Sequence, residues 1–205
     1  MIYIINYGVG NLSSIANIIK KVGGESEIIN DVSLLKTAKK IILPGVGAFD
    51  HGMKKLAEHG WIEGLNDAVL NRKIPVLGIC LGMQLLCKSS EEGILPGLGW
   101  IDAEVKKFSF PEGSDLKIPH MGWNTVKVKK DNPLLKITDE EQRFYFVHSY
   151  RVVCNNSEDT LATTNYGVEF TSSLSHNNIL GAQFHPEKSH RFGMSFLKNF
   201  IDIPC

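Results

Sequence analysis

The sequence contains no hydrophobic run long enough to cross a membrane and no cysteine pair at the spacing of a metal site. No apolar stretch reaches the roughly 18 residues that a membrane-spanning helix needs. Residues 1–5 lack the basic start of a signal peptide and are typical of a strand. The scattered cysteines argue against disulfides and a structural metal and favour a reducing cytoplasm; they are Cys80, Cys87, Cys154 and Cys205.

Charge of one sign is not in excess. Lys and Arg together number 22, as do Asp and Glu, so the formal net charge is zero and no nucleic-acid-binding surface is indicated. Hydrophobic residues make up 43% and charged residues 21% of the chain, as in ordinary globular proteins. Since the 205 residues contain no repeats or linkers, we expect one domain over residues 1–205.

Short apolar runs alternate with helical patterns through the first half of the chain. The runs with the length and composition of strands are 2–6, 27–30, 40–43 and 74–79. The helical segments between them are 12–22, 32–38 (with Asp31 as N-cap) and two pieces of 52–70. This alternation predicts a parallel α/β sheet, in which ligands bind beyond the carboxyl ends of the strands.

The second half is predicted to be richer in strands. They are expected over 99–110, 124–129, 143–153, 160–165, 169–174 and 179–184. Asn177 and Asn178 predict a hairpin turn before the last of them. A final amphipathic helix is expected over 191–201, because its phenylalanines recur every four residues.

The strand 74–79 leads into a glycine-flanked cysteine, Gly78-Ile-Cys80-Leu-Gly82, and the pattern then becomes helical from Met83 to Lys88. A strand, a nucleophile between glycines and a helix are together typical of a nucleophile elbow. The glycines would let substrate and backbone approach the sulfur, and the helix N-terminus would favour the reactive thiolate. A buried, inert cysteine is the alternative interpretation.

A cysteine nucleophile needs a base, and His185 is the histidine best placed for that role. It ends an apolar strand, and Glu187 lies two residues on, so in extended geometry both side chains would point to the same side. Pro186 holds His185 out of the helical region. A carboxylate so placed would orient the imidazole, as in a triad. Alone, the motif fits an ordinary turn; together with the Cys80 motif it indicates acyl transfer.

Acyl transfer also needs backbone donors for an oxyanion. The N–H of Leu81 is one candidate, and the glycine-rich loop Gly45-Val46-Gly47 is a second, although it could be a plain strand-to-helix connection. Gln84, one helical turn beyond Cys80, could contact the substrate or be a buried amide. The loop 7–11 favours a tight turn over a dinucleotide site, since Ser13 stands where that motif has a third glycine.

Motifs in a fixed order carry a resemblance to a known family: Pro44–Phe49, Gly78–Leu86, Pro119–Asn124, Phe146–Tyr150 and Gln183–Ser189. They resemble the class I glutamine amidotransferases, in particular the glutaminase subunits that act with a (β/α)8-barrel cyclase in histidine biosynthesis. The resemblance extends from the first strand to the last helix. It implies a flavodoxin-like α/β fold, a mostly parallel sheet flanked by helices, with additional antiparallel strands in the second half.

Position by position, the resemblance implies roles for the residues singled out above. Cys80 would attack the side-chain amide of glutamine, with His185 as base and Glu187 as its partner, and no metal or cofactor is implied. The backbone of Gly47 and Leu81 would form the oxyanion site.

The resemblance also implies a substrate pocket and a partner. Gln84 and the segment His148-Ser149-Tyr150 would hold L-glutamine. Ammonia would pass to the barrel cyclase within a heterodimer, with no role for nucleic acid or membrane. The positions that match this interface are Asn11, Trp123 and Lys188, for which packing or surface roles remain open.

The sequence departs from the family pattern at two positions. Asn6 stands where Asp is usual, and Arg151 where an aromatic residue is common. In addition, residues 93–103 and 190–194 are similar to paralogues found with surface-polysaccharide genes. The alternative function is therefore supply of ammonia for amidation of a surface sugar.

Overall fold

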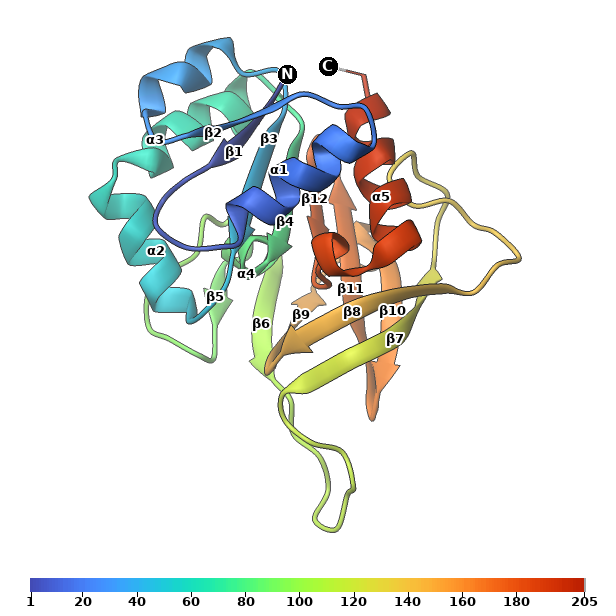
Figure 1. Cartoon of the computed structure of the whole chain (residues 1–205). Helices are drawn as coiled ribbons and strands as arrows, with labels where there is room; N and C mark the ends of the chain where they lie inside the picture. Colours follow the sequence, from blue (N-terminus) through green and yellow to red (C-terminus); the bar gives the residue numbers. More distant parts are fainter. Residues whose placement is uncertain (205) are drawn as a thin grey trace.

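The computed structural model describes residues 1–204 and is built around one mixed sheet (Figure 1). Its parallel part runs in the order β2 (Ser26–Ile29), β1 (Ile2–Ile5), β3 (Ile41–Gly45), β4 (Val76–Cys80) and β12 (Ile179–Ala182). This order is that of flavodoxin-like sheets, in which ligands bind at the carboxyl ends of the strands. The predicted fold class is confirmed.

Antiparallel strands extend the sheet beyond β12. They follow in the order β11 (Val168–His176), β10 (Thr160–Tyr166), β7 (His120–Val128) and β8 (Gln142–His148). A branch of the sheet starts at β11, which also pairs with β9 (Tyr150–Cys154). Strand β9 in turn pairs with β6 (Ala103–Lys107), and β6 pairs with β5 (Ser89–Ser90). The predicted turn between the last two strands is confirmed, since Asn177 adopts a φ of 52° between β11 and β12.

Helices cover both faces of the parallel part. On one face α1 (Leu12–Lys21) packs against α5 (His190–Asp202). On the other, α2 (Phe49–Glu58) packs against α3 (Trp61–Asn66) and α4 (Leu81–Leu85). Figure 1 shows α1 and α5 side by side and both chain ends at the edge away from the β7–β8 hairpin. Short helical turns complete the fold over Val32–Thr37, Asp67–Asn71, Ser157–Asp159 and Pro186–Lys188.

Successive residues of the central strands alternate between two cores. Ile4 and Ile42 face the core under α1 and α5, whereas Ile5 and Leu43 face the core under α2 and α3. A strand buried on both faces has no polar side, which explains the near-continuous apolar runs of the sequence. No helix within residues 1–204 has the length and apolar character needed to cross a membrane.

Several predicted strands are wrong in extent: β7 begins at His120 rather than at residue 124, and β12 ends at Ala182 rather than at residue 184. The strand expected over 143–153 is two strands, β8 and β9, because the chain leaves the β7 ladder at Ser149 to pair with β6. The strand expected over 99–110 is confined to β6. The N–H groups of Leu98, Gly99 and Trp100 instead donate to carbonyls at the end of α4, which would otherwise be unpaired.

The cysteines Cys80, Cys87 and Cys154 are free thiols. Burial raises the pKa of the Cys87 and Cys154 thiols, so both favour the unreactive neutral form, although hydrogen bonds with Thr160 and Thr171 lower the pKa of Cys154 in part. Cys205, the remaining cysteine of the sequence analysis, lies outside the described residues.

Candidate active site

Cys80 occupies a sharp turn between β4 and α4. It ends the strand, directly precedes the helix and adopts φ 55° and ψ −112°, a left-handed conformation that is uncommon for a residue with a side chain. Strained backbone of this kind persists where the surrounding packing fixes it. The predicted elbow geometry is therefore present, although the helix begins at Leu81 rather than Met83.

The glycines around Cys80 allow close backbone packing. A Cβ on Gly82 would lie 1.8 Å from the carbonyl oxygen of Leu43, and a Cβ on Gly78 would lie 2.7 Å from that of Gly82. Strand β3, strand β4 and the start of α4 thus approach one another more closely than any side chain permits. The predicted close approach of backbone at these glycines is therefore confirmed, and the approach of the substrate stays a prediction.

The backbone around His185 is held by β8 and by Ser189. The N–H of His185 donates to the carbonyl oxygen of Tyr145 (2.9 Å), and the hydroxyl of Ser189 donates to the carbonyl oxygen of His185 (2.6 Å). His185 keeps an extended backbone, as the following proline predicts. Glu187, however, lies in the helical turn Pro186–Lys188, not in the extended chain that the sequence analysis assumed.

This turn brings the carboxylate of Glu187 to 2.7 Å from Nδ1 of His185, with each side chain 3% exposed. Burial lowers the pKa of His185, but the nearby sulfur of Cys80 and the carboxylate of Glu187 outweigh it and raise that pKa to about 10. His185 therefore carries a proton at neutral pH. Its Nε2 is buried and has no hydrogen-bond partner within residues 1–204, which leaves it available to a bound molecule.

A cavity of about 460 Å³ opens at this edge of the sheet. It contains Cys80 and His185, and both predicted oxyanion residues, Gly47 and Leu81, line it as well. Gly47 has a φ of 99°, a conformation that glycine adopts without strain. The other lining residues are Val46, Ala48, Gln84, Glu92, Pro119, Val147, His148, Ser149, Tyr150 and Lys188.

All predicted substrate contacts line this cavity, but two of them are committed to the fold. The amide nitrogen of Gln84, a buried residue, donates to the carbonyl of Tyr150 (3.2 Å) and to Oε1 of Gln183 (3.1 Å). The sequence left open whether Gln84 is a substrate contact or a buried amide. In the structure it is a buried, hydrogen-bonded amide that also lines the cavity. His148 is likewise buried, with Nδ1 2.7 Å from the carbonyl oxygen of Tyr150.

Several residues of the site carried no prediction. Gln183, fully buried, has its amide nitrogen 4.0 Å from the sulfur of Cys80. The carboxylate of Glu92 accepts a bond from the N–H of Phe49 (2.8 Å) at the start of α2 and also lines the cavity. The hydroxyl of Tyr7 donates to the carbonyl of Pro44 (2.6 Å) in the strand before the Gly47 loop. A polar residue within the apolar run 179–184 was the available signal in the sequence for Gln183.

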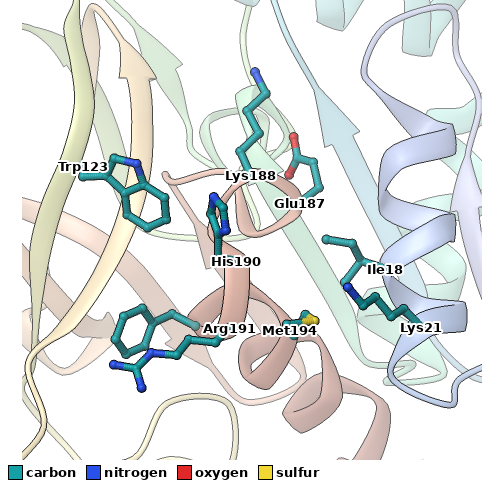
Figure 2. A pocket seen from close by; sticks show the side chains of 9 residues that line it. Ile18, Lys21, Trp123, Glu187, Lys188, His190, Arg191 and Met194 are labelled. Atoms are coloured by element: carbon teal, nitrogen blue, oxygen red, sulfur yellow. The ribbon is translucent and has the colours of Figure 1, made fainter.

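A second cavity, of about 560 Å³, lies beside the first (Figure 2). Trp123 lines one side of it, Ile18 and Lys21 of α1 line the other, and Lys188 and His190 lie between them. Trp123 is 41% exposed, and its ring packs against that of His190. The predicted interface residues Trp123 and Lys188 thus share one surface, whereas Asn11, exposed at the start of α1, does not line this cavity.

A cysteine elbow, a buried histidine–carboxylate pair and two glycine-rich strand ends around one cavity define an amidotransferase site on a flavodoxin-like sheet. The sequence matches the family "Glutamine amidotransferase class-I" over residues 3–203, and the chain belongs to this family.

Three similar proteins are subunits of imidazole glycerol phosphate synthase. The chain is 55% identical over 201 residues to imidazole glycerol phosphate synthase subunit HisH 2 of Methanococcus maripaludis, covering 98% of each chain. It is 48% identical over 204 residues to subunit HisH of Leptospira borgpetersenii, covering 99% of this chain and all of that one. It is 46% identical over 203 residues to subunit HisH 2 of Pseudomonas aeruginosa, again with 99% and 100% covered.

Solved structures agree on the fold. A glutamine amidotransferase superposes with a TM-score of 0.71 at 19% identity, covering 97% of both chains. PurLQS from Thermotoga maritima superposes with a TM-score of 0.68 at 18% identity, covering 97% of this chain and 94% of that one. These similarities concern the fold alone.

Proposed function

We propose that this chain is the glutaminase subunit of an imidazole glycerol phosphate synthase. It hydrolyses L-glutamine to glutamate and ammonia and supplies the ammonia to a cyclase partner in histidine biosynthesis. The single observation that carries the chemistry is the buried Glu187–His185 pair in the same cavity as the strained Cys80. The pathway rests on the full-length similarity to HisH subunits.

In the proposed reaction, the sulfur of Cys80 attacks the side-chain amide carbon of glutamine, and backbone N–H groups at Gly47 and Leu81 stabilise the oxyanion. Each such donor lowers the activation barrier by on the order of 3 kcal/mol. The protonated His185 gives its proton to the leaving nitrogen, the carbon–nitrogen bond breaks, and ammonia leaves a thioester. His185 then removes a proton from water, which attacks the thioester and releases glutamate and the cysteine sulfur.

Glu187 acts through His185. Its carboxylate at Nδ1 fixes the ring so that Nε2 faces the reacting groups, and it stabilises the imidazolium that is present before the first step and forms again in the second. The carboxylate of Glu92 in the cavity wall offers an anionic partner for the α-ammonium group of glutamine. Lys188, at the mouths of both cavities, offers a cation for the α-carboxylate.

The proposed partner is a (β/α)8-barrel cyclase that forms a heterodimer with this chain and performs the lyase step. Ammonia would be channelled to it from the Cys80 cavity past the surface of Trp123 and Lys188. Exposed Met121 and Trp123 on one strand supply apolar contact area for that surface. We place the complex in a reducing compartment such as the cytoplasm, because an oxidising one would consume the Cys80 thiol.

The test is glutamate release by the purified chain, alone and with its cyclase partner and the acceptor nucleotide. We expect the complex to be active and Cys80→Ala to lower activity at least about 1,000-fold with the fold intact. Labelling of Cys80 by an electrophilic glutamine analogue, followed by mass spectrometry, checks the nucleophile separately. Undiminished activity of Cys80→Ala would refute the proposal.

The alternative of ammonia supply for a surface sugar is not favoured, because the relatives are synthase subunits over their whole length. The same assay separates the two functions. Stimulation by a sugar-modifying partner but not by the cyclase would support the alternative.

A further inference from the structure

A chain of hydrogen bonds that passes through two buried histidines ends at the wall of the Cys80 cavity. Asn124 donates from Nδ2 toward Nε2 of His120 (3.1 Å), Nδ1 of His120 lies 2.9 Å from Nε2 of His148, and Nδ1 of His148 lies 2.7 Å from the carbonyl oxygen of Tyr150. His120 is 2% and His148 6% exposed. The ladder of β7 and β8 places these histidines directly opposite each other.

The contacts fix every proton in this chain. A carbonyl oxygen only accepts, so Nδ1 of His148 must carry a hydrogen and Nε2 of the neutral ring must accept. His120 must then donate from Nδ1 and accept at Nε2, which faces the amide hydrogens of Asn124. The second amide hydrogen of Asn124 goes to the carbonyl of Asn165 (3.0 Å), and its oxygen accepts from the N–H of Thr125 (2.8 Å). Donors and acceptors match at each step.

The surroundings of the two rings favour this neutral arrangement. The ring of His120 stacks on Tyr166 at 4.0 Å and on Phe146 at 4.8 Å, and Phe108 lies 5.3 Å from His148. Burial lowers the pKa of His148 to about 3 and that of His120 to about 4. In an apolar site a neutral, fully paired chain is strengthened, whereas a lost partner leaves a costly unpaired group.

We propose that His120 and Asn124 are positioning residues for the glutamine pocket: they fix His148 in one tautomer and thereby hold the Tyr150 carbonyl and the segment 148–150 in the cavity wall. The inference rests on the proposed function. Gln84 donates to the same carbonyl, so the chain continues toward Gln183 and the sulfur of Cys80. A displaced Tyr150 carbonyl would therefore disturb both the wall and the contact behind the nucleophile.

A pair of substitutions separates hydrogen bonding from packing. His120→Phe keeps an aromatic ring against Tyr166 but removes both nitrogens. His120→Asn gives up the ring but places an amide donor near the position of Nδ1. We expect His120→Phe to raise the KM for glutamine about tenfold, as for one lost buried hydrogen bond, with a smaller change in kcat. We expect His120→Asn to recover part of that loss, and His59→Phe, at an exposed histidine that follows the C-terminal end of α2, to change nothing.

The tautomers provide a readout that does not depend on glutaminase activity. Nitrogen-15 NMR of histidine-labelled protein should show His120 and His148 both protonated at Nδ1 and not at Nε2 at pH 7, and His120→Phe should alter the His148 signals. Protonation of His148 at Nε2 in the unsubstituted protein would overturn the inference, whatever the activity. An unchanged KM in a folded His120→Phe would overturn it too. If that variant fails to fold, Asn124→Ala is measured in the same two ways. Absence of glutaminase activity in the unsubstituted complex would instead refute the proposed function.

Discussion

The parallel and antiparallel parts of the sheet build the site by different means. In the parallel part, Cys80 and the end of β3 take their places from close packing, through Gly45, Gly78 and Gly82, whose Cβ positions are occupied by neighbouring atoms. In the antiparallel part, the wall formed by residues 147–150 is paired in the β7–β8 and β6–β9 ladders, and side-chain hydrogen bonds add to this pairing. Gln84 donates to the Tyr150 carbonyl, and His120 bonds to His148, which bonds to the same carbonyl. The Cys80 sulfur is thus positioned mainly by close backbone packing. The substrate pocket depends in addition on side-chain hydrogen bonds, which single substitutions can remove.

The largest expected effect tests the backbone frame. Gly82→Ala would place a methyl group 1.8 Å from the Leu43 carbonyl oxygen, and neither backbone segment can move without distorting the sheet. We expect a loss of about 3 kcal/mol or more in the free energy of unfolding, measured by urea denaturation. The control is Gly23→Ala, where a Cβ would meet nothing within 4 Å and only the strain of a φ of 83° is added. Equal stability of the two variants would contradict the packing role.

An intermediate effect is expected where the two parts meet, at His185. Glu187→Gln keeps the shape of the side chain but removes its charge from Nδ1 of His185. We expect kcat/KM for glutamine to fall on the order of 100-fold, because the imidazolium loses its buried counter-ion. Labelling of Cys80 by the electrophilic analogue should slow as well. A variant with full activity would show that orientation by the carboxylate is unnecessary.

The same pair predicts a pH dependence of stability. The pKa of His185 is about 10 in the folded chain and about 6.5 in the unfolded one. The charge on His185 therefore stabilises the fold in full below pH 6.5, and this contribution is lost as the pH rises through 10. Urea denaturation at pH 6 and at pH 9.5 should show a larger decrease for the unsubstituted chain than for Glu187→Gln. Identical decreases would contradict the raised pKa.

The sequence was sufficient for the features that are local in the chain. The elbow at Cys80, the turn at Asn177 and the alternation of strands and helices depend on neighbouring residues, and the structure has each of them. The Glu187–His185 contact was predicted for the wrong reason, because a proline turn replaces the extended segment. The contact forms all the same, because His185 keeps an extended backbone before the turn and the turn carries the Glu187 carboxylate back to Nδ1 of His185.

What could not be predicted depends on register between distant strands. The pairing of His120 with His148 follows from the β7–β8 ladder, and the break at Ser149 follows from competition between β7 and β6 for the same chain. No local sequence pattern indicates that β8 pairs with β7 or that β9 pairs with β6. Gln183 was missed for a related reason: its neighbours Gln84 and Cys80 come from a segment about one hundred residues earlier.

The smallest expected effect sharpens the comparison, because it removes a side-chain hydrogen bond from the parallel part. Tyr7→Phe deletes the hydroxyl that donates to the Pro44 carbonyl, at a fully buried position where the ring itself fits unchanged. We expect a loss of about 1 kcal/mol in the free energy of unfolding, the usual value of one buried hydrogen bond. Since strand β3 is fixed by its ladders to β1 and β4, we expect the KM for glutamine to change less than twofold. A tenfold rise in KM would mean that the Gly47 loop, like the antiparallel wall, depends on side-chain hydrogen bonds.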